Sequence, residues 1–253
     1  MKDMNLSDVS AVFLKDGERA DDLQRGGLRI IQHERLFRFG TDAVLLADFA
    51  LIKHGALTAD FGTGTGAIAL LLAGRHPDIR VTALELQKEP FDMARRSVIM
   101  NGMEERINVL NADIKNAPAL IGRGVYDAVV CNPPYYKEGS GAQPEGDNGR
   151  ISRFAGEMTV DSLCGSASAV LKSGGRLSVV FPAARMQEMM SAMERQALAP
   201  KRVRTVHATS AHVPKIVLLD AVKHGGEGLM WLPPLILKNA DGTPTEEWNR
   251  IYG

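Results

Sequence analysis

Asp60-Phe61-Gly62-Thr63-Gly64-Thr65-Gly66 is the stretch of this sequence that decides the fold. The apolar run Ala56–Phe61 leading into it predicts a strand, and Ala67–Gly74 after it predicts a helix. Glycines at such a junction let the backbone approach a ligand closely and adopt positive φ angles that other residues disfavour. We therefore expect a ligand-binding turn at the carboxyl end of a strand. The plainer alternative is a tight strand–helix turn that binds nothing.

The rest of the chain repeats this alternation of strand and helix. A helix is expected to begin at Thr41-Asp42, where apolar residues follow at helical spacing. Further strands are expected at Val81–Leu84, Ile107–Leu110, Val125–Cys131, Arg176–Phe181, Val203–His207 and Ile216–Val222, and further helices at Pro90–Met100, Thr159–Leu171 and Ala183–Gln196. The methionines of the last helix predict core packing rather than a binding surface. The pattern predicts an α/β fold with a doubly wound, mostly parallel seven-stranded sheet and an antiparallel strand at its C-terminal edge.

The chain divides into three regions without a linker that would separate two large domains. Residues 1–40 form an N-terminal extension, which is expected to begin disordered and to continue as short strands or a hairpin over Leu23–Phe39. Residues 41–224 form the core, and residues 225–253 a tail that packs on it. Within the core, Lys137–Arg153 is rich in Gly, Ser, Pro and Asn, and it predicts a long loop of the kind that is functional or disordered.

Composition excludes several classes of protein. The 253 residues include 30 basic and 30 acidic side chains, so any nucleic-acid contact must come from a local patch rather than a global positive field. Cys131 and Cys164 are too few for a disulfide scaffold and lack metal-ligand spacing, so we expect no metal and a cytoplasmic location. No apolar run of about 18 residues occurs, and the N-terminus lacks the apolar segment of a signal peptide, so no membrane partner is expected.

Two carboxylates follow the next two strands. Glu85 lies nineteen residues after Gly66, where a carboxylate can accept hydrogen bonds from both hydroxyls of a ribose. Asp113 follows the third strand and could accept the amino group of an adenine, although an Asx turn or a helix cap explains it nearly as well. Ligands bind at the carboxyl ends of strands in open α/β sheets, so these residues predict a nucleoside site. The glycine pattern also fits the relaxed dinucleotide fingerprint, so a nicotinamide cofactor and S-adenosylmethionine remain alternatives at this point.

Asn132-Pro133-Pro134-Tyr135 ends the predicted strand Val125–Cys131 and narrows the function. It supplies a side-chain amide, a carbonyl on a proline-stiffened turn and a flat aromatic ring. These groups suit the holding of a planar amine beside a bound methyl donor. A rigid surface turn is the alternative, and the glycine loop upstream argues against it.

On these residues the chain resembles the class I S-adenosylmethionine-dependent methyltransferases that carry an Asn-Pro-Pro-Tyr motif. Within them it is similar to the bacterial tRNA1(Val) adenine-N(6)-methyltransferase group, over about Leu28 to Val222. The resemblance rests on Phe37–Ala47, Asp60–Gly66, Glu85, Asp113, Asn132–Tyr136 and Pro214–Leu219. Where that group has an Arg-His-Glu-like stretch, this chain has Arg153-Phe154-Ala155-Gly156-Glu157, without the histidine.

The resemblance implies a Rossmann-like methyltransferase fold, S-adenosylmethionine as cofactor and a set of residues that bind it. These residues are Phe39, Thr41, Asp42, Asp60, Gly62, Gly64, Gly66, Glu85, Leu86, Asp113, Ile114 and Asn132. Asp60 and the glycines would face the methionine part of the cofactor, and Glu85 would hold the ribose hydroxyls. Leu86 would pack on the adenine, and Asp113 with the Ile114 backbone would bind its edge. The Phe39–Asp42 segment would close over the cofactor from the other side, although Asp42 also fits a helix N-cap.

The resemblance also implies the reaction: methylation of the 6-amino group of an adenosine in tRNA, next to the anticodon of tRNA1(Val). The Asn132 side-chain oxygen and the Pro133 carbonyl would each accept a hydrogen bond from the amine and stabilise the positive charge that develops there. Tyr135 would stack on the base. The implied catalytic residues are Asn132, Pro133 and Tyr135, and the implied substrate-binding residues are Pro134, Tyr135, Tyr136, Lys201, Arg202, Arg204 and Lys215.

Two groups of basic residues offer a way for this neutral protein to bind RNA. One spans Arg195 to Lys215 without an acidic residue, and the other comprises Arg25, Arg29, Arg35 and Arg38. We expect both groups to flank the Asn132 pocket and hold the phosphate backbone while the base enters it. Solvated strand faces are the alternative.

Other functions stay open on sequence alone. Asn-Pro-Pro-Tyr enzymes also methylate the glutamine amide of release factors, but those usually carry a long helical domain in front. Guanine in rRNA and adenine in DNA are further planar amines. A cofactor-binding protein without catalysis is hard to reconcile with an intact Asn132, and a nicotinamide oxidoreductase leaves the tetrapeptide unexplained.

Overall fold

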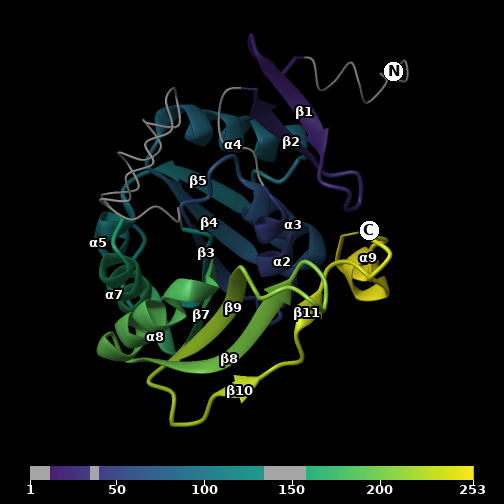
Figure 1. The fold of residues 1–253 in the computed structure, drawn as a ribbon. Coiled ribbons are helices and arrows are strands. Elements are labelled where there is room, and N and C mark those ends of the chain that lie inside the picture. Colours follow the sequence, from purple (N-terminus) through teal and green to yellow (C-terminus); the bar gives the residue numbers. More distant parts are fainter. Residues whose placement is uncertain (1–11, 35–39, 134–157, 253) are drawn as a thin grey trace, which may run out of the picture.

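One large mixed sheet dominates the computed structural model, which describes residues 12–34, 40–133 and 158–252 (Figure 1). Its strand order is β10-β8-β9-β7-β6-β3-β4-β5, and β11 also pairs with β8. The longer strands are β3 (Leu57–Phe61), β4 (Arg80–Glu85), β5 (Ile107–Asn111), β6 (Tyr126–Cys131), β7 (Leu171–Pro182), β8 (Leu198–His207) and β9 (Ile216–Lys223). The short ones are β10 (Met230–Trp231) and β11 (Leu235–Ile236). The predicted seven-stranded α/β fold is confirmed, with two short strands added beside β8.

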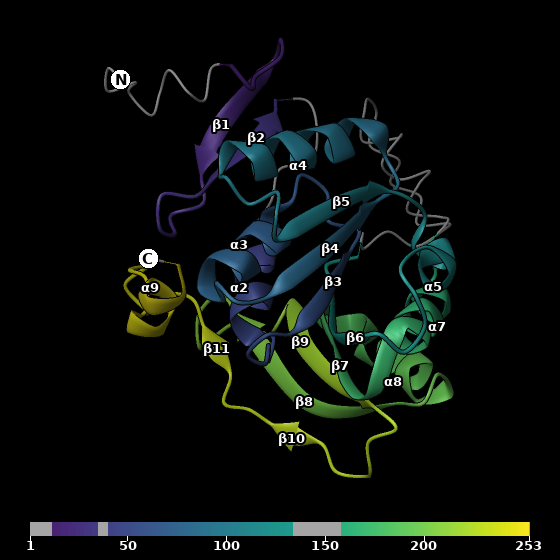
Figure 2. The ribbon, with the colours of Figure 1, turned by 180° about the vertical axis from the view of Figure 1, so that it is seen from behind.

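Helices cover both faces of this sheet, as the two opposite views show (Figures 1 and 2). One face carries α2 (Thr41–Phe49), α3 (Ala67–Arg75) and α4 (Lys88–Met100). The other carries α5 (Ala117–Leu120), α7 (Val160–Val170) and α8 (Met186–Arg195), with the 3₁₀ turns η1 (Ile114–Asn116) before α5 and η2 (Ala183–Arg185) before α8. Each face therefore has its own apolar core. Met189 and Met193 of α8 are fully buried, which confirms that its methionines pack in the core.

The parallel part of the sheet runs β5-β4-β3-β6-β7. Its central strands are buried on both faces, and β6 is accordingly an almost continuous apolar run from Ala128 to Cys131. Strand β7 begins at Leu171 rather than at the predicted Arg176. The reason is that Leu171 already pairs with Tyr126, ahead of an irregularity in the register.

Strand β9 runs antiparallel to both of its neighbours, β7 and β8. The antiparallel strand β9 therefore lies between β7 and β8, and its buried Asp220 links these three strands. The Asp220 carboxylate accepts a hydrogen bond from Arg176 of β7 and lies 3.6 Å from the Arg202 guanidinium of β8. Arg202 in turn lies 4.3 Å from the ring centroid of Phe49, which links this junction to the end of α2.

An antiparallel hairpin of β1 (Glu18–Asp22) and β2 (Arg29–His33) packs on α4. Its first strand precedes Leu23, so the predicted hairpin over Leu23–Phe39 begins too late. Contacts with α4 explain this placement: Arg96 donates to both carboxylate oxygens of Glu18 at 2.6 Å, and the Ile31 N–H donates to the Ser97 hydroxyl at 2.9 Å. Residues 35–39 lie outside the described part.

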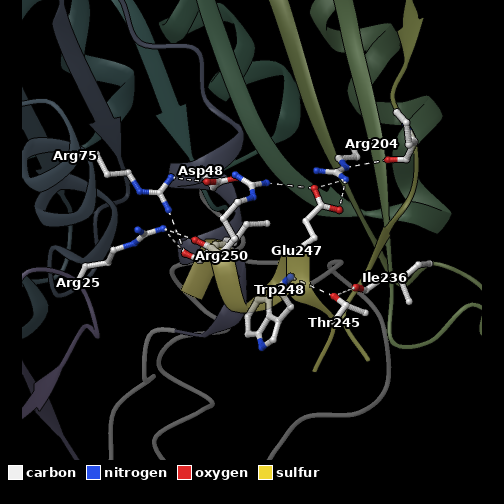
Figure 3. A network of polar contacts seen from close by, with 11 residues as sticks. Arg25, Asp48, Arg75, Arg204, Ile236, Thr245, Glu247, Trp248 and Arg250 are labelled. Carbon is white, nitrogen blue, oxygen red and sulfur yellow. Dashed lines mark hydrogen bonds and ion pairs between the residues drawn. The ribbon is translucent and has the colours of Figure 1, made fainter. Parts of the chain in front are cut away.

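The C-terminal segment comes after β9, pairs with β8 through β10 and β11, and ends in α9 (Glu246–Tyr252), which contacts α2 (Figure 2). Arg204 of β8 donates to both carboxylate oxygens of Glu247 at 2.8 Å (Figure 3). Arg25 and Arg75 both donate to the carbonyl of Ile251 in the last turn of α9. Cations suit this end because the last helical carbonyls lack intrahelical partners and carry the negative end of the helix dipole.

We predict that the buried ion pair of Asp220 is worth far more than a surface pair. Asp220→Ala should lower the free energy of unfolding by about 3–5 kcal/mol, because it leaves two arginines partly buried without their carboxylate. The matched control is Asp161→Ala, which removes an exposed carboxylate paired with Arg195 at 2.7 Å and should cost at most about 1 kcal/mol. Urea unfolding measures both, and equal losses would contradict the assignment of Asp220 as the tie between β7, β9 and β8.

Candidate functional site

The strand register places three of the predicted site residues in one row. Phe61 of β3 is aligned with Leu84 of β4 and with Cys131 of β6. The residues that follow them are Gly62, Glu85 and Asn132. Because these strands are parallel, the three residues leave the sheet side by side at its carboxyl edge, where the sequence predicts a ligand site.

The glycine loop has the backbone geometry that the sequence predicts. The φ angles of Gly62, Gly64 and Gly66 are 69°, 59° and 96°, in the region that favours glycine. The Gly62 N–H donates to the Leu84 carbonyl at 2.9 Å, which ties the loop to the neighbouring strand. A Cβ on Gly66 would stand 3.4 Å from Ala94, whereas no described residue lies within 4 Å of a Cβ position on Gly64. Among the described residues, Gly64 therefore leaves room that a ligand could fill.

Asp60 is a buried carboxylate at the base of this loop. Its Oδ2 accepts the Thr63 hydroxyl at 2.6 Å, and its Oδ1 has no hydrogen-bond partner among the described residues. Burial raises the pKa of Asp60 to about 7; the charge of Glu85 adds to this, while Thr63 and the backbone of Ala69 oppose it. A buried carboxylate oxygen without a partner is stabilised by a proton or by a cationic group. The site therefore fits a ligand that carries an ammonium group.

Glu85 joins the glycine loop to the end of β4. Its carboxylate accepts the Gly64 N–H at one oxygen and the Gln87 N–H at the other, both at 2.9 Å. Burial raises the pKa of Glu85, and these backbone hydrogen bonds partly offset that effect. Each carboxylate oxygen has a second lone pair, so both retain capacity for a further donor such as a ribose hydroxyl.

Leu86, Asp113 and Ile114 lie beyond the ends of β4 and β5. Leu86 is 37% exposed, so its apolar side chain offers a face that a flat ring could cover. Asp113 precedes η1, and its Oδ1 accepts the Lys115 N–H at 2.8 Å. Asp113 therefore does cap this turn, through one of its two carboxylate oxygens. Ile114 is buried beneath this turn.

Asn132 and Pro133 lie at the end of β6, Asn132 half-buried and Pro133 buried. The preceding Cys131 is fully buried, and burial raises the pKa of its thiol well above the usual value, so it remains protonated and is no nucleophile. Four predicted site residues lie outside the described part of the chain: Phe39, Pro134, Tyr135 and Tyr136.

Thr41 and Asp42 form the first turn of α2, and both are half-buried. The N-cap of this helix is Gly40, with extended φ and ψ of −110° and 178°, and it has no side chain with which to cap the helix. The N-cap alternative for Asp42 is therefore wrong. Its carboxylate lies instead in the first turn, where a negative charge interacts favourably with the helix dipole.

The structure does not bring Lys201, Arg202 and Arg204 to this site. They lie on β8, which β9 and β7 separate from β6, and their cationic groups are engaged elsewhere. Lys201 donates to the carbonyls of Glu227 at 2.9 Å and of Gly226, Arg202 pairs with Asp220, and Arg204 with Glu247. All three hold the C-terminal segment or α2 in place. Their predicted role as an RNA surface has no support from this placement.

Of the other basic residues, some bond within the protein and others are exposed. Arg25 donates to the end of α9 (Figure 3). Arg29 donates to the Ala20 carbonyl at 2.9 Å, within the N-terminal hairpin. Lys215, by contrast, is exposed and directly precedes β9. The next residue, Ile216, is aligned with Pro182 at the end of β7, which puts Lys215 on the same edge of the sheet as Asn132.

Sequence reasoning missed two residues that shape this site. Thr63 holds Asp60, and Asn111 at the end of β5 donates to the carbonyls of Glu85 and Leu86 at 2.8 and 2.9 Å. The signal for Asn111 was its position at the end of a strand next to β4, where its register partner is Glu85.

In residues 12–34, 40–133 and 158–252, no group of three or more His, Cys, Asp and Glu side chains could hold a metal ion. No helix in these ranges is long and apolar enough to cross a membrane.

Known proteins similar to this chain are methyltransferases. Residues 39–209 match the family model of the methyltransferase small domain. A protein of Phocaeicola vulgatus named tRNA1(Val) (adenine(37)-N6)-methyltransferase is 30% identical over 190 residues, covering 75% of this chain and 79% of its own length.

Solved structures share the fold. A predicted O-methyltransferase of Agrobacterium tumefaciens superposes with a TM-score of 0.69 at 24% identity, covering 84% of this chain and 95% of its own. A geranyl diphosphate C-methyltransferase of Streptomyces coelicolor, solved with S-adenosyl-L-homocysteine, gives a TM-score of 0.53 at 16% identity, covering 72% of this chain and 74% of its own.

We predict that Asp60 makes folding stability depend on pH. Its pKa is about 7 in the folded protein against 3.8 in a free side chain, so the folded state binds the proton more tightly. The resulting stabilisation is complete below about pH 4 and is lost as the pH rises through about 7, a change of at most about 4 kcal/mol. Asp60→Asn should remove this dependence.

Urea unfolding between pH 5 and pH 8 measures the effect. The stability of Asp60→Asn relative to the unmodified protein should rise with pH. A difference that stays constant over this range would contradict the raised pKa.

Proposed function

The chain belongs to the methyltransferase small-domain family, and on that premise we propose that it methylates the exocyclic 6-amino group of an adenosine in tRNA, next to the anticodon of tRNA1(Val). As a member of the family it is an S-adenosylmethionine-dependent methyltransferase. The observation that carries the proposal for the acceptor is the position of Asn132, level with Glu85 and the glycine loop at the carboxyl edge of the sheet. The relative from Phocaeicola vulgatus supports adenosine in tRNA as the acceptor. A tRNA substrate would place the enzyme in the cytoplasm.

The described residues fit the cofactor part by part. S-adenosylmethionine carries an ammonium group, a ribose diol and an adenine ring, and it supplies an electrophilic methyl group on its sulfonium. We assign the ammonium group to Asp60, whose buried Oδ1 has no partner among the described residues. Glu85 would accept the ribose hydroxyls with lone pairs that its backbone hydrogen bonds leave unused. Leu86 would lie against the adenine, and Asp113 with the Ile114 backbone would bind its edge.

Asn132 and Pro133 would position and polarise the acceptor. An adenine amine is a weak nucleophile because its lone pair is delocalised into the ring. Hydrogen bonds from its two N–H groups to the Asn132 side-chain oxygen and the Pro133 carbonyl would turn the lone pair toward the methyl group. They would also stabilise the positive charge that develops on nitrogen. No general base has to act before methyl transfer, since the amine can lose its extra proton afterwards.

The base must leave its stack before it can enter this site. Tyr135, which follows Asn132 and the two prolines, is proposed as the ring on which the extruded base stacks, a contact worth about 1–3 kcal/mol. Pro134 and Tyr136 are proposed as further contacts. Lys215 is proposed to contact phosphate at the same edge. For Lys201, Arg202 and Arg204 to do so, their bonds to carbonyls, Asp220 and Glu247 would first have to break.

The substrate class can be decided by one labelling experiment. The protein is incubated with labelled S-adenosylmethionine and with total RNA, DNA or protein from cells that lack it. We expect label in the tRNA fraction, and N6-methyladenosine after digestion to nucleosides. Label in protein would instead indicate a glutamine amide, and label in rRNA or DNA another nucleobase amine; each of these results would overturn the tRNA proposal.

We predict that Asn132 serves the chemistry more than cofactor binding. Asn132→Ala should abolish most methyl transfer, because the amine loses a hydrogen-bond acceptor that matters most in the transition state. Asn132→Asp keeps an oxygen in place and should retain more turnover than Asn132→Ala. Affinity for S-adenosylhomocysteine, measured by calorimetry, should stay within a few-fold for both variants. Near-normal turnover by Asn132→Ala would refute this mechanism.

A further inference from the structure

Asn111 is a polar side chain at the edge of the site to which the proposed reaction gives no role. It is the last residue of β5, and its register partner on β4 is Glu85. Its side-chain amide donates one hydrogen bond to the Glu85 carbonyl at 2.8 Å and one to the Leu86 carbonyl at 2.9 Å. Both amide protons are thus used on two successive peptide groups of the neighbouring strand end.

These two peptide groups carry the parts of the site assigned to the adenosine half of the cofactor. The first peptide group contains the Glu85 carbonyl, and the second contains the Leu86 carbonyl. The next N–H, that of Gln87, donates to the Glu85 carboxylate at 2.9 Å. Any rotation of the turn would therefore move the Glu85 side chain as well. The Ala112 N–H also donates to the Glu85 carbonyl, at 3.0 Å, so β5 holds this turn from its own strand end.

We propose that Asn111 is a positioning residue for the adenosine half of S-adenosylmethionine. By holding two carbonyls it fixes the turn Glu85–Gln87, so that the Glu85 carboxylate meets the ribose hydroxyls and Leu86 the adenine face. The Glu85 carboxylate is held from its other side by the Gly64 N–H. Asn111 thus fixes the main chain of Glu85, while the glycine loop holds its carboxylate. This inference rests on the proposed cofactor roles of Glu85 and Leu86, and it is independent of which acceptor is methylated.

The test measures ligand binding by calorimetry without any RNA, so its failure is distinguishable from failure of the tRNA proposal. The probes are S-adenosylhomocysteine and 5′-methylthioadenosine, which lacks the amino-acid part. Asn111→Ala should weaken both by about tenfold, the loss expected for two hydrogen bonds that orient a charged partner. Asn111→Asp should weaken both more, because its carboxylate would face two carbonyl oxygens. The matched control is Asn108→Ala, at an exposed position of the same strand, and it should bind both probes normally.

A double-mutant cycle separates positioning from a general loss of structure. If Asn111 acts through Glu85, then Asn111→Ala combined with Glu85→Gln should bind S-adenosylhomocysteine little more weakly than Glu85→Gln alone. A purely structural role would make the two losses multiply. Asn111→Ser, whose hydroxyl cannot reach both carbonyls, replaces Asn111→Ala if the latter fails to fold.

Three results would overturn the proposal. The first is unchanged affinity of Asn111→Ala or Asn111→Ser for both probes. The second is weakened binding of S-adenosylhomocysteine with unchanged binding of 5′-methylthioadenosine, which would assign the effect to the amino-acid half. The third is losses that multiply in the cycle.

Discussion

The site depends on the bond between the Glu85 carboxylate and the N–H of Gly64. This contact, 2.9 Å long, joins the glycine loop after β3 to the end of β4, and it fixes the loop in a conformation with three positive φ angles. A carboxylate is the side chain best suited to this, because it accepts from two backbone N–H groups and still offers lone pairs to a ligand. Since the same group is assigned to the ribose, loop shape and cofactor affinity depend on one residue.

Two buried carboxylates in one place are unfavourable without a ligand. Burial raises the pKa values of both Asp60 and Glu85, and the charge of Glu85 adds to the effect on Asp60. A cofactor that brings an ammonium group to one and hydroxyl donors to the other would relieve this cost. The features that make the apo site unfavourable are therefore those that would make it bind a zwitterionic nucleoside. Its selectivity for S-adenosylmethionine over a nicotinamide dinucleotide would follow from Asp60, because Glu85 could accept the ribose hydroxyls of either ligand.

The arginines of this neutral protein show how little a basic residue says about nucleic acid until its partners are known. Arg25, Arg75 and Arg204 hold α9 (Figure 3). Arg96 holds the N-terminal hairpin. Guanidinium groups suit such tasks because they donate several hydrogen bonds in a fixed plane. A basic residue free to contact RNA is therefore expected at the carboxyl edge of the sheet, where Lys215 lies, rather than along β8.

The sequence by itself determined the sheet, the glycine loop and the strand-end residues Glu85, Asp113 and Asn132. These follow from local rules: apolar periodicity sets strands and helices, glycine marks positive φ, and parallel strands bring their carboxyl ends to one edge. The tertiary structure alone decided which side chains share a hydrogen bond across strands. Asn111 reaches Glu85, Arg202 turns to Asp220, and Arg204 to Glu247, over separations of 26, 18 and 43 residues. Such pairings depend on register and on which face each side chain takes, and those are fixed only when the whole sheet has formed.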